Sequence, residues 1–439
     1  MNIREEARKM KLDAPKMAAM APEVRNRALL AIRDAIRARK DDIFAANEED
    51  MREAKASGVS ESIQKRLKFN EAKMKDVLSG IDELVKLPDP LGKTLLARQL
   101  DEGLRLFRVS VPIGVIGVIF EARPDAMVQI STLCIKSGNC AILKGGKETA
   151  RTNRVLFGVI YEAAVAAGLP AGCLLQAELH NEIDELLSCE QEVDLLIPRG
   201  SNAFVRYIMD HTKIPVMGHA DGVCHIYVDR DADREKAIPV ILDAKTQYSA
   251  ACNAVETILV SRDIAGEFLP ELAKALAGAG VKMRGTAEVA GILSGRDGDG
   301  PSFDVEIMPE DSFHKEYLDF TISLKVVADV EEAVSHINRF GSHHTDSILT
   351  ENDETAEYFM QMVDSAGVYR NCSTRFADGY RYGFGAEVGI STGKLHARGP
   401  VGLDGLVTYK YRLYGDGHIV GDYATGKRQF HFEDIHARI

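Results

Sequence analysis

The chain has 439 residues, of which 45% are hydrophobic and 27% are charged, a composition typical of globular proteins with a large core. At about 100–200 residues per domain, this length predicts roughly two to four domains. The net charge is −12, which argues against a nucleic acid or an anionic membrane as a partner. A small anionic ligand is not excluded, because a local basic pocket is compatible with an acidic surface.

The first residues, Met1–Glu6, contain no apolar core and include acidic side chains, so we predict no secretory signal. The longest apolar run, Val111–Phe120, is interrupted by Pro112, Gly114 and Gly117 and is too short to span a membrane. The seven cysteines are odd in number and form no CxxC pair, which fits free thiols in a reducing compartment. We therefore expect a soluble, cytoplasmic protein.

The first part of the chain, residues 2–87, shows apolar residues at helical spacing and no strong strand signal. It is followed by a predicted β-hairpin, with strands at 95–100 and 104–109 and a turn at 101–103. Apolar and charged residues alternate in this hairpin, so one face is expected to be exposed. We predict that it lies outside the main sheet, at a contact between subunits.

From Gly114 onward, strands and helices alternate. Predicted strands at 115–120, 140–143, 173–175 and 194–197 are separated by predicted helices at 125–136 and 149–167 and by helices beginning at Glu182 and Asn202. This alternation indicates a parallel sheet covered on both faces. Ligands of such sheets bind beyond the carboxyl ends of the strands, and here those ends carry the polar or Gly/Pro-rich segments 121–125, 144–147 and 198–201.

A second alternating block extends from a strand at 225–228 to about residue 373, after a boundary placed near 219–223. Its predicted elements are a helix at 231–245, strands at 257–260, 320–327 and 346–349, and helices at 330–339 and from Glu354. Beyond Asn371 glycine becomes dense, which indicates a long functional loop. A late strand is predicted at 406–411.

One cysteine stands on the short connection between a predicted helix and a predicted strand of the second block. Cys252 is flanked by small residues in Ser249-Ala250-Ala251-Cys252-Asn253-Ala254, so its thiol is sterically open and suits a nucleophile. Taken alone, a cysteine among alanines is better interpreted as a small buried side chain, and only the rest of the chain favours the nucleophile.

Two segments of the first block are candidates for binding a cofactor. Lys144 ends a strand before Gly145-Gly146, so its ammonium can hold a ribose or phosphate while the glycines admit the ligand; the alternative is a turn with a solvated lysine. Gly200-Ser201 opens a helix whose N–H groups can face a phosphate, although Ser201 is explained equally well as a helix cap. Neither segment shows a complete GxGxxG fingerprint.

Three further positions carry side chains suited to catalysis. Arg123 can clamp an oxyanion, or form a salt bridge with Glu121 or Asp125. His219 can transfer a proton, since an unperturbed histidine has a pKa of about 6.5, or it can simply bond to the backbone. His343-His344 suggest a metal, but adjacent side chains point apart and no third ligand has a matching spacing, so we predict no metal site.

Taken together, these motifs resemble the aldehyde dehydrogenase superfamily along nearly the whole chain. The segment Val111–Pro124 is similar to the first strand of its nucleotide-binding domain, and Leu143–Glu148 to its cofactor-binding lysine turn. Leu196–Ser201 is similar to its glycine–serine segment, and Ser249–Thr257 to its catalytic cysteine loop. The resemblance implies that Cys252 is the nucleophile, that Lys144, Gly145, Gly200 and Ser201 bind NADPH, and that Glu316 holds the nicotinamide ribose.

The departures from the superfamily pattern narrow the expected reaction. Where hydrolytic members carry a water-activating glutamate, this chain has Gly218-His219-Ala220-Asp221-Gly222, so aldehyde release is favoured over thioester hydrolysis. The asparagine that serves the oxyanion is replaced by the turn at Glu121–Pro124, which leaves the Cys252 N–H, Asn253 and Arg123 as candidate donors. We predict that Arg375 and the glycine-rich loop bind the carboxylate of the substrate.

The implied activity is NADPH-dependent reduction of L-glutamyl 5-phosphate to L-glutamate 5-semialdehyde and phosphate through a Cys252 thioester, in proline biosynthesis. A CoA-acylating or hydrolytic aldehyde dehydrogenase and a catalytically silent scaffold are the alternatives. A homo-oligomer is expected, and a glutamate 5-kinase is a candidate partner that supplies the acyl phosphate.

The predicted fold is α/β and aldehyde dehydrogenase-like, with a Rossmann-type cofactor domain, an α/β catalytic domain and a small β oligomerisation hairpin. The predicted segments are N-terminal helices at 1–94, the hairpin at 95–110, an NADPH-binding domain at 111–222, a catalytic domain at 223–373, and a substrate loop with a strand and tail at 374–439.

Overall fold

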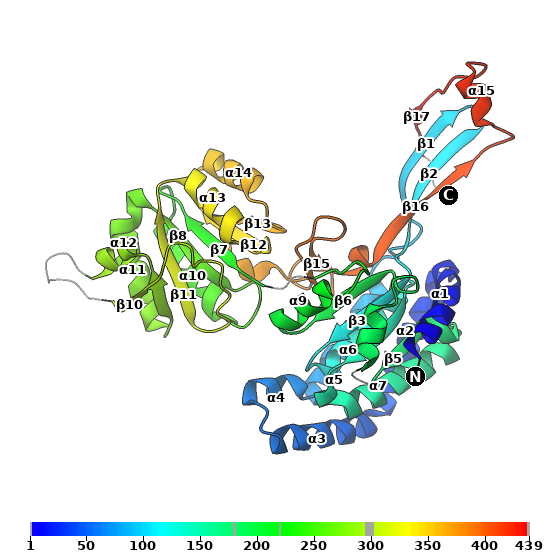
Figure 1. Cartoon of the computed structure of the whole chain (residues 1–439), viewed down its shortest axis with the longest axis horizontal. Coiled ribbons are helices and arrows are strands. Elements are labelled where there is room, and N and C mark those ends of the chain that lie inside the picture. Colours follow the sequence, from blue (N-terminus) through cyan, green and yellow to red (C-terminus); the bar gives the residue numbers. More distant parts are fainter. Residues whose placement is uncertain (1, 179–180, 219–220, 295–302, 437–439) are drawn as a thin grey trace. The chain divides into compact units, whose positions relative to one another are not determined.

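The computed structural model describes residues 2–178, 181–218, 221–294 and 303–436 (Figure 1). The chain forms two compact units. Unit 1 comprises residues up to 217, together with 384–389 and those from 401 onward, and unit 2 comprises 218–383 and 390–400. No helix within the described ranges is long and apolar enough to cross a membrane.

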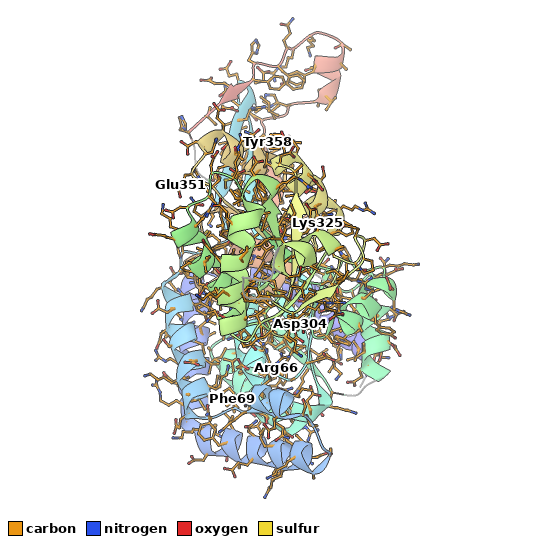
Figure 2. The ribbon with its side chains drawn as sticks, turned by 90° about the vertical axis from the view of Figure 1, so that its left-hand side faces the viewer. Arg66, Phe69, Asp304, Lys325, Glu351 and Tyr358 are labelled. Atoms are coloured by element: carbon orange, nitrogen blue, oxygen red, sulfur yellow. The ribbon has the colours of Figure 1, made fainter. Side chains whose placement is uncertain are left out.

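Unit 1 begins with helices, as the sequence predicts. They are α1 (Ile3–Ala19), α2 (Pro22–Ala38), α3 (Lys40–Ala56), α4 (Glu61–Leu67) and α5 (Glu71–Lys86). Asparagine side chains cap two of these helices, because Asn2 accepts from the Glu5 N–H and Asn70 from the Lys73 N–H. Phe69, labelled in Figure 2, is buried beside this second cap.

A parallel sheet forms the centre of unit 1, with the strand order β5-β4-β3-β6. Its elements are β3 (Val115–Phe120), α6 (Pro124–Lys136), β4 (Cys140–Gly145), η1 (Lys147–Thr149), α7 (Ala150–Ala166), η2 (Ala171–Cys173), β5 (Leu174–Ala177), α8 (Asn181–Leu187), β6 (Leu195–Arg199) and α9 (Asn202–Asp210). All six residues of β3 are buried, as expected for a strand covered on both faces. The order changes direction at β3, so the ends of β3, β4 and β6 border a site of the kind that binds nucleotides.

The predicted hairpin is part of a larger antiparallel sheet, with the order β16-β2-β1-β17. β1 (Thr94–Asp101) and β2 (Leu104–Pro112) form the hairpin, β16 (Val407–Tyr414) pairs with β2, and β17 (Glu433–Asp434) pairs with β1. Between them lies α15 (Val420–Ala424). The Asp101 carboxylate accepts hydrogen bonds from His431 and Tyr423, which lower the pKa of Asp101 to about 2. The C-terminal tail is therefore folded onto the hairpin.

Unit 2 contains a sheet of seven parallel strands, in the order β10-β9-β11-β8-β7-β12-β13. Its elements are β7 (Cys224–Val228), α10 (Arg234–Thr246), β8 (Val255–Ser261), α11 (Arg262–Gly278), β9 (Lys282–Gly285), α12 (Ala287–Leu293), β10 (Val305–Ile307), β11 (Thr321–Val327), α13 (Val330–Phe340), β12 (Thr345–Leu349), α14 (Asp353–Met362), β13 (Gly367–Arg370) and η3 (Thr374–Phe376). In Figure 2, Lys325 on β11 and Glu351, just after β12, are labelled.

The two faces of this sheet are covered by different helices. Ile226 and Val228 pack in one core cluster with α10, α11 and α12, whereas Tyr227, between them, packs in another with α13 and α14. This separation follows from the alternation of side chains along a strand. Helices therefore cover both faces of the sheet, and the connecting loops lie at the ends of its strands.

The remaining short elements belong to the part of the sequence, about residues 384–406, in which the chain passes from one unit to the other. They are β14 (Gly389–Ser391), β15 (Gly399–Val401) and η4 (Leu403–Leu406). The predicted fold class, α/β with parallel sheets and a small antiparallel sheet, is confirmed. The sequence prediction does not include α11, α12, β9, β10, β13 or β17. The strands among them extend the two sheets that it does predict, and the two helices pack on the sheet of unit 2.

Candidate active site

The Cys252 loop, residues 247–254, joins the end of α10 to the start of β8. Two successive backbone hydrogen bonds close it, from the Ala251 N–H to the Tyr248 carbonyl at 3.3 Å and from the Ala254 N–H to the Ala251 carbonyl at 2.9 Å. Cys252 is partly exposed, whereas Asn253 and Ala254 after it are buried. The loop thus leaves the sulfur accessible and anchors the residues that follow it.

Close packing against a glycine fixes the backbone of Cys252. A Cβ placed on Gly222 would lie 2.2 Å from the Cys252 carbonyl oxygen and 2.6 Å from its Cα. These distances are far below van der Waals contact, so position 222 admits no side chain without a shift of the nucleophile's backbone. The thiol of buried Cys224 also lies 3.4 Å from the same carbonyl and donates to it.

Side chains after β13 hold the rest of the Cys252 loop. The Asn253 side-chain amide donates to the Ala377 carbonyl at 2.8 Å, and the Thr374 hydroxyl donates to the Asn253 carbonyl at 2.7 Å. Both side chains are buried. In this arrangement the Asn253 amide anchors the loop, and its predicted part in binding an oxyanion stays a prediction.

His344 lies directly beside the nucleophile. Its Nε2 is 3.2 Å from the Cys252 Sγ, and its Nδ1 is 2.9 Å from the Thr345 hydroxyl. The neighbouring His343 turns elsewhere, with its Nδ1 2.6 Å from the Asp364 carbonyl oxygen. The expectation that the two histidines point apart is confirmed, but the sequence prediction does not recognise His344 as a partner of Cys252.

Arg375, the predicted substrate residue, belongs to the same cluster. It is 8% exposed, its Nε donates to the Gln247 side-chain oxygen at 3.0 Å, and its guanidinium lies 5.9 Å from the centre of the Tyr248 ring. Burial lowers the pKa of Arg375, as does the charge of Arg381, while Cys252 acts in the opposite direction. A guanidinium on the Cys252 loop is thus available to an anionic substrate.

A buried ion pair lies at the base of the loop. Lys245 at the end of α10 and Glu256 on β8 are 2.6 Å apart, and neither side chain is exposed. Burial raises the pKa of Glu256 to about 7, although Lys245 lowers it. Glu316, predicted to hold the nicotinamide ribose, is partly exposed and its charge also raises the pKa of Glu256, so it lies in the same part of unit 2.

Of the seven free cysteines, only Cys252 and Cys372 are partly exposed. Burial raises the pKa of each of the other thiols, which keeps them protonated and poorly nucleophilic: Cys134, Cys140, Cys173, Cys189, Cys224 and Cys372. Exposure and surroundings therefore single out Cys252 as the candidate nucleophile.

The predicted cofactor residues lie at the carboxyl edge of the parallel sheet in unit 1. Lys144 is 5% exposed and its ammonium donates to the Gly145 carbonyl at 2.8 Å. Burial lowers the pKa of Lys144, while Glu182, Glu148 and Glu178 raise it. A Cβ on Gly145 would lie 2.2 Å from the Asn153 side-chain nitrogen, so the backbone is tightly packed there and leaves no room for a side chain.

A carboxylate occupies the start of α9, where the sequence predicts a phosphate contact. The Ser201 N–H donates to the Glu121 side chain at 3.0 Å, and a Cβ on Gly200 would lie 2.5 Å from the same oxygen. An anion is therefore accommodated at this helix N-terminus, here supplied by the protein itself. The buried ammonium of Lys144 and this anion-accepting backbone lie at the same edge of the sheet, on the two sides of β3, an arrangement that fits the phosphate and ribose groups of a dinucleotide.

The predicted catalytic roles of Arg123 and His219 stay predictions. Arg123 is an exposed residue that precedes α6 in unit 1, whereas Cys252 belongs to unit 2. His219 lies outside the described residues. Within the ranges that the structure describes, no group of three or more His, Cys, Asp and Glu side chains is arranged to hold a metal ion.

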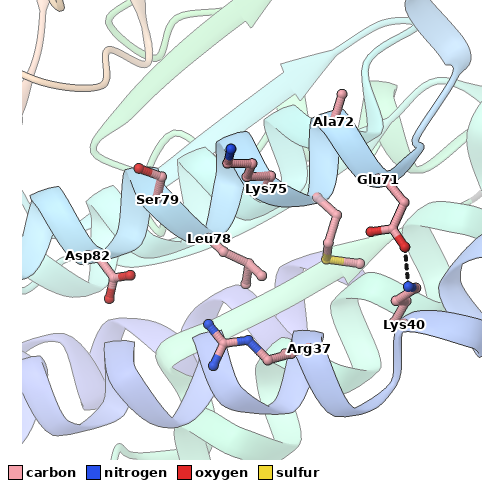
Figure 3. A pocket seen from close by; sticks show the side chains of 9 residues that line it. Arg37, Lys40, Glu71, Ala72, Lys75, Leu78, Ser79 and Asp82 are labelled. Carbon is pink, nitrogen blue, oxygen red and sulfur yellow. Dashed lines mark hydrogen bonds and ion pairs between the residues drawn. The ribbon is translucent and has the colours of Figure 1, made fainter.

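A hollow of about 640 Å³ also lies between α2 and α5 (Figure 3). Charged side chains such as Arg37 and Asp82 line it, and Lys40 pairs with Glu71 at one end. It contains no cysteine or histidine among its lining residues. The chemistry predicted from the sequence therefore lies elsewhere.

Comparison with known proteins finds a matching family model and relatives that match over nearly the whole chain. The model of the aldehyde dehydrogenase family matches residues 1–290. γ-Glutamyl phosphate reductase of Acetivibrio thermocellus is 53% identical over 430 residues, which are 98% of this chain and 97% of the relative. The enzyme of the same name from Ruminiclostridium cellulolyticum is 53% identical over 439 residues, 100% of this chain and 99% of the relative.

A solved structure agrees with these relatives. The crystal structure of γ-glutamyl phosphate reductase from Thermotoga maritima matches with a TM-score of 0.91 and 37% identity, over 95% of this chain and all of that chain. The similarity thus extends over both units and the antiparallel sheet.

Proposed function

The chain belongs to the aldehyde dehydrogenase family and has the activity of its γ-glutamyl phosphate reductases, and we propose that Cys252 carries this activity. The reaction reduces L-glutamyl 5-phosphate with NADPH to L-glutamate 5-semialdehyde and phosphate, the second step of proline biosynthesis from glutamate. The observation that carries the proposal is an accessible cysteine on an anchored turn, in a chain that matches these reductases from end to end.

The first chemical step is the attack of the Cys252 sulfur on the acyl carbon. A C–S bond forms and the C–O bond to phosphate breaks, which yields a thioester and inorganic phosphate. The backbone of Cys252 is fixed by Gly222 and by the bonds of the loop, so the sulfur is held in one place before the substrate arrives. The Cys252 N–H is the proposed donor to the oxyanion; such a donor contributes about 3–4 kcal/mol.

Arg375 is proposed to bind the carboxylate of the glutamyl group. Its guanidinium is held by Gln247 and lies over Tyr248, both on the loop that carries Cys252. A planar cation fixed in this way presents two N–H groups to a carboxylate. Because Arg375 contacts the loop that carries Cys252, we expect it to bind an anionic group of the substrate that is remote from the reacting carbon.

Lys144, Gly145, Gly200 and Ser201 are proposed to hold NADPH, with Glu316 at the nicotinamide ribose. The buried ammonium of Lys144 and the anion-accepting start of α9 fit the polar half of the cofactor. When bound, NADPH supplies the hydride that reduces the thioester to the oxidation level of the aldehyde. Binding of its phosphate at α9 requires the Glu121 carboxylate to leave the Ser201 N–H.

The antiparallel sheet supports a proposal of a homo-oligomer. Its strand β16 carries the exposed apolar side chains Tyr409, Tyr411 and Leu413, and exposed groups of this kind mark contacts between proteins. We further propose a cytoplasmic location, since all seven cysteines are free thiols, and supply of the acyl phosphate by a glutamate 5-kinase.

The test is the reverse reaction, with glutamate semialdehyde, NADP and inorganic phosphate as substrates. Phosphate-dependent formation of NADPH by the wild type, lost in Cys252→Ala and kept in Cys372→Ala, supports the proposal. Cys372 is the matched control because it is the other partly exposed cysteine. Activity without phosphate indicates a hydrolytic dehydrogenase, and activity retained by Cys252→Ala refutes the role of Cys252.

A further inference from the structure

A buried imidazole faces the nucleophile. The His344 side chain is 1% exposed, and its Nε2 lies 3.2 Å from the Cys252 Sγ. We infer that His344 accepts the proton of the Cys252 thiol before acylation and returns it when the aldehyde leaves. The inference rests on the proposed role of Cys252 and adds a second catalytic residue to it.

The other nitrogen of the ring is held in a way that suits this task. The His344 Nδ1 is 2.9 Å from the Thr345 hydroxyl oxygen, and the His344 carbonyl accepts from the Gly367 N–H at 3.0 Å. In the tautomer that carries its hydrogen on Nδ1, the imidazole donates to the Thr345 oxygen, and the lone pair of Nε2 is directed at the thiol. The arrangement of nucleophile, base and orienting group is that of an activated nucleophile.

The order of strands explains why these residues meet. β8, β7 and β12 are neighbours in the parallel sheet, so the segments that precede them converge at its amino edge. Cys252 stands three residues before β8, and His344 directly before β12. The contact therefore joins two segments that are fixed by the central strands of unit 2.

A buried network holds the start of β12 in place. Both the backbone N–H and the ring Nδ1 of His225 contact the Asp346 carboxylate, at 2.7 and 3.1 Å, and the Ser365 hydroxyl donates to its other oxygen. His225 and Asp346 are fully buried. Asp346 follows His344 by two residues, so this network fixes the backbone from which the imidazole projects.

The proposed proton transfers balance over the reaction. The thiol proton moves to the His344 Nε2, the thiolate forms the C–S bond, and phosphate leaves as the anion. After reduction by the hydride, the hemithioacetal oxyanion re-forms the carbonyl, the C–S bond breaks, and the sulfur takes the proton back from the imidazolium. The histidine therefore ends the cycle in its initial state.

Several titratable or charged groups surround the pair, and each remains in the variants described below. Cys224 and Arg375 interact electrostatically with Cys252; the charged groups that act on these two in turn are Asp346, Glu256, Arg381, Asp378 and Asp243, and Lys245 pairs with Glu256. A comparison of wild type with a variant at position 344 therefore isolates the imidazole. His343 is the matched control, because it is adjacent in sequence and contacts the Asp364 carbonyl instead of the sulfur.

The experiment measures alkylation of Cys252 by iodoacetamide, followed by mass spectrometry of the peptide, between pH 6 and 9 in the ligand-free full-length protein. In His344→Asn we expect the rate at pH 7 to fall at least about 10-fold, and kcat in the reverse reaction to fall about 100-fold, the scale of general acid–base catalysis. The KM for NADP should change less than about threefold. His343→Asn should resemble the wild type; asparagine also tolerates the positive φ of 59° at position 343.

His344→Gln provides a second variant, since its amide can still bond to sulfur but cannot take its proton. Thermal unfolding establishes that each variant is folded. Alkylation and kcat that match the wild type in either folded variant would overturn the inference. The two proposals fail in different measurements. If His344 is not the base, the position-344 variants are alkylated at the wild-type rate. If Cys252 is not the nucleophile, Cys252→Ala still turns over substrate.

Discussion

The ammonium of Lys245 lies 2.6 Å from the carboxylate of Glu256, and neither side chain is exposed to solvent. Lys245 is the penultimate residue of α10, before the Cys252 loop, and Glu256 is the second residue of β8, after it. The pair therefore joins the two ends of the loop that presents the nucleophile. A buried pair of this kind is costly to form and costly to break on one side only.

Removal of the lysine alone should destabilise the protein strongly. We expect Lys245→Met to lower the free energy of unfolding by about 3–5 kcal/mol, because it leaves a carboxylate buried without its partner. The double variant Lys245→Met/Glu256→Leu should recover most of that loss, since apolar side chains replace the whole pair. Denaturation in urea measures both changes.

The control is the exposed pair of Lys236 and Glu351, whose side chains are 61% and 49% exposed. Lys236→Met should cost far less stability than Lys245→Met, because water screens an exposed ion pair. If the buried and the exposed lysine variants lose the same stability, burial of the Lys245–Glu256 pair is not the cause.

The same carboxyl group predicts a dependence of stability on pH. Its pKa is about 7 in the folded protein against an ordinary value of 4.5, so the folded state binds the proton more tightly than the unfolded state. The stability that this group contributes is fully present below pH 4.5 and is lost as the pH rises to about 7. The loss is on the order of 3 kcal/mol, at ~1.4 kcal/mol for each pH unit.

Glu256→Gln removes this titration. As the pH rises from 4.5 to about 7, the wild type should therefore lose stability relative to Glu256→Gln. At higher pH the difference in unfolding free energy between the two proteins should be constant. Urea denaturation at a series of pH values gives the difference directly. A difference that does not vary with pH would contradict the raised pKa of Glu256.

Much of unit 1 could be predicted from the sequence because its strands are continuous apolar runs. β3 occupies the predicted range Val115–Phe120, and all of its residues are buried. Short strands with exposed or mixed positions give no such signal. β9 (Lys282–Gly285) alternates between exposed and covered residues, and every residue of β13 (Gly367–Arg370) is only partly buried. They are strands because of the neighbours that they pair with.

The residues of the candidate site also differ in how much of their position the sequence could predict. The local features of Cys252 make it a candidate only, since a small buried thiol explains them too; the resemblance over the rest of the chain is what predicts a nucleophile. The contact of His344 with Cys252 could not be predicted, because 92 residues separate them and only the strand order of unit 2 brings them together. The one available signal is a histidine two residues before the predicted strand at 346–349, and it has meaning only because that strand lies beside β7.

Gly222 gives a prediction on catalysis. Gly222→Ala should lower kcat at least about 10-fold, because a misplacement of reacting groups by about 1 Å can cost 100-fold, and the new Cβ meets the Cys252 backbone. The control Gly266→Ala lies in α11 with no atom within 4 Å of its Cβ, and should stabilise the helix by about 0.5–1 kcal/mol. Equal kcat for both variants would show that the packing at Gly222 does not hold the nucleophile.

Arg375 gives a prediction on substrate binding. Arg375→Gln should raise the KM for glutamate semialdehyde by about 10–100-fold, the value of a hydrogen bond to a charged group, with little change in the KM for NADP. Arg370→Gln, which removes an ion pair with exposed Asp353, serves as the control. Steady-state kinetics of the reverse reaction measure both constants, and an unchanged KM for the semialdehyde would place the carboxylate site elsewhere.

The pairing of β16 with β2 has a consequence for biosynthesis. About 300 residues, including all of unit 2, separate these two strands in the chain. At roughly 5–20 residues per second on the ribosome, the edge of β2 waits for about 15–60 s before its partner emerges. Unit 2 can fold within that interval, whereas the antiparallel sheet of unit 1 is completed only once β16 has emerged. Until then the open edge of β2 can pair with other chains, so this edge is where a chaperone would protect the nascent chain.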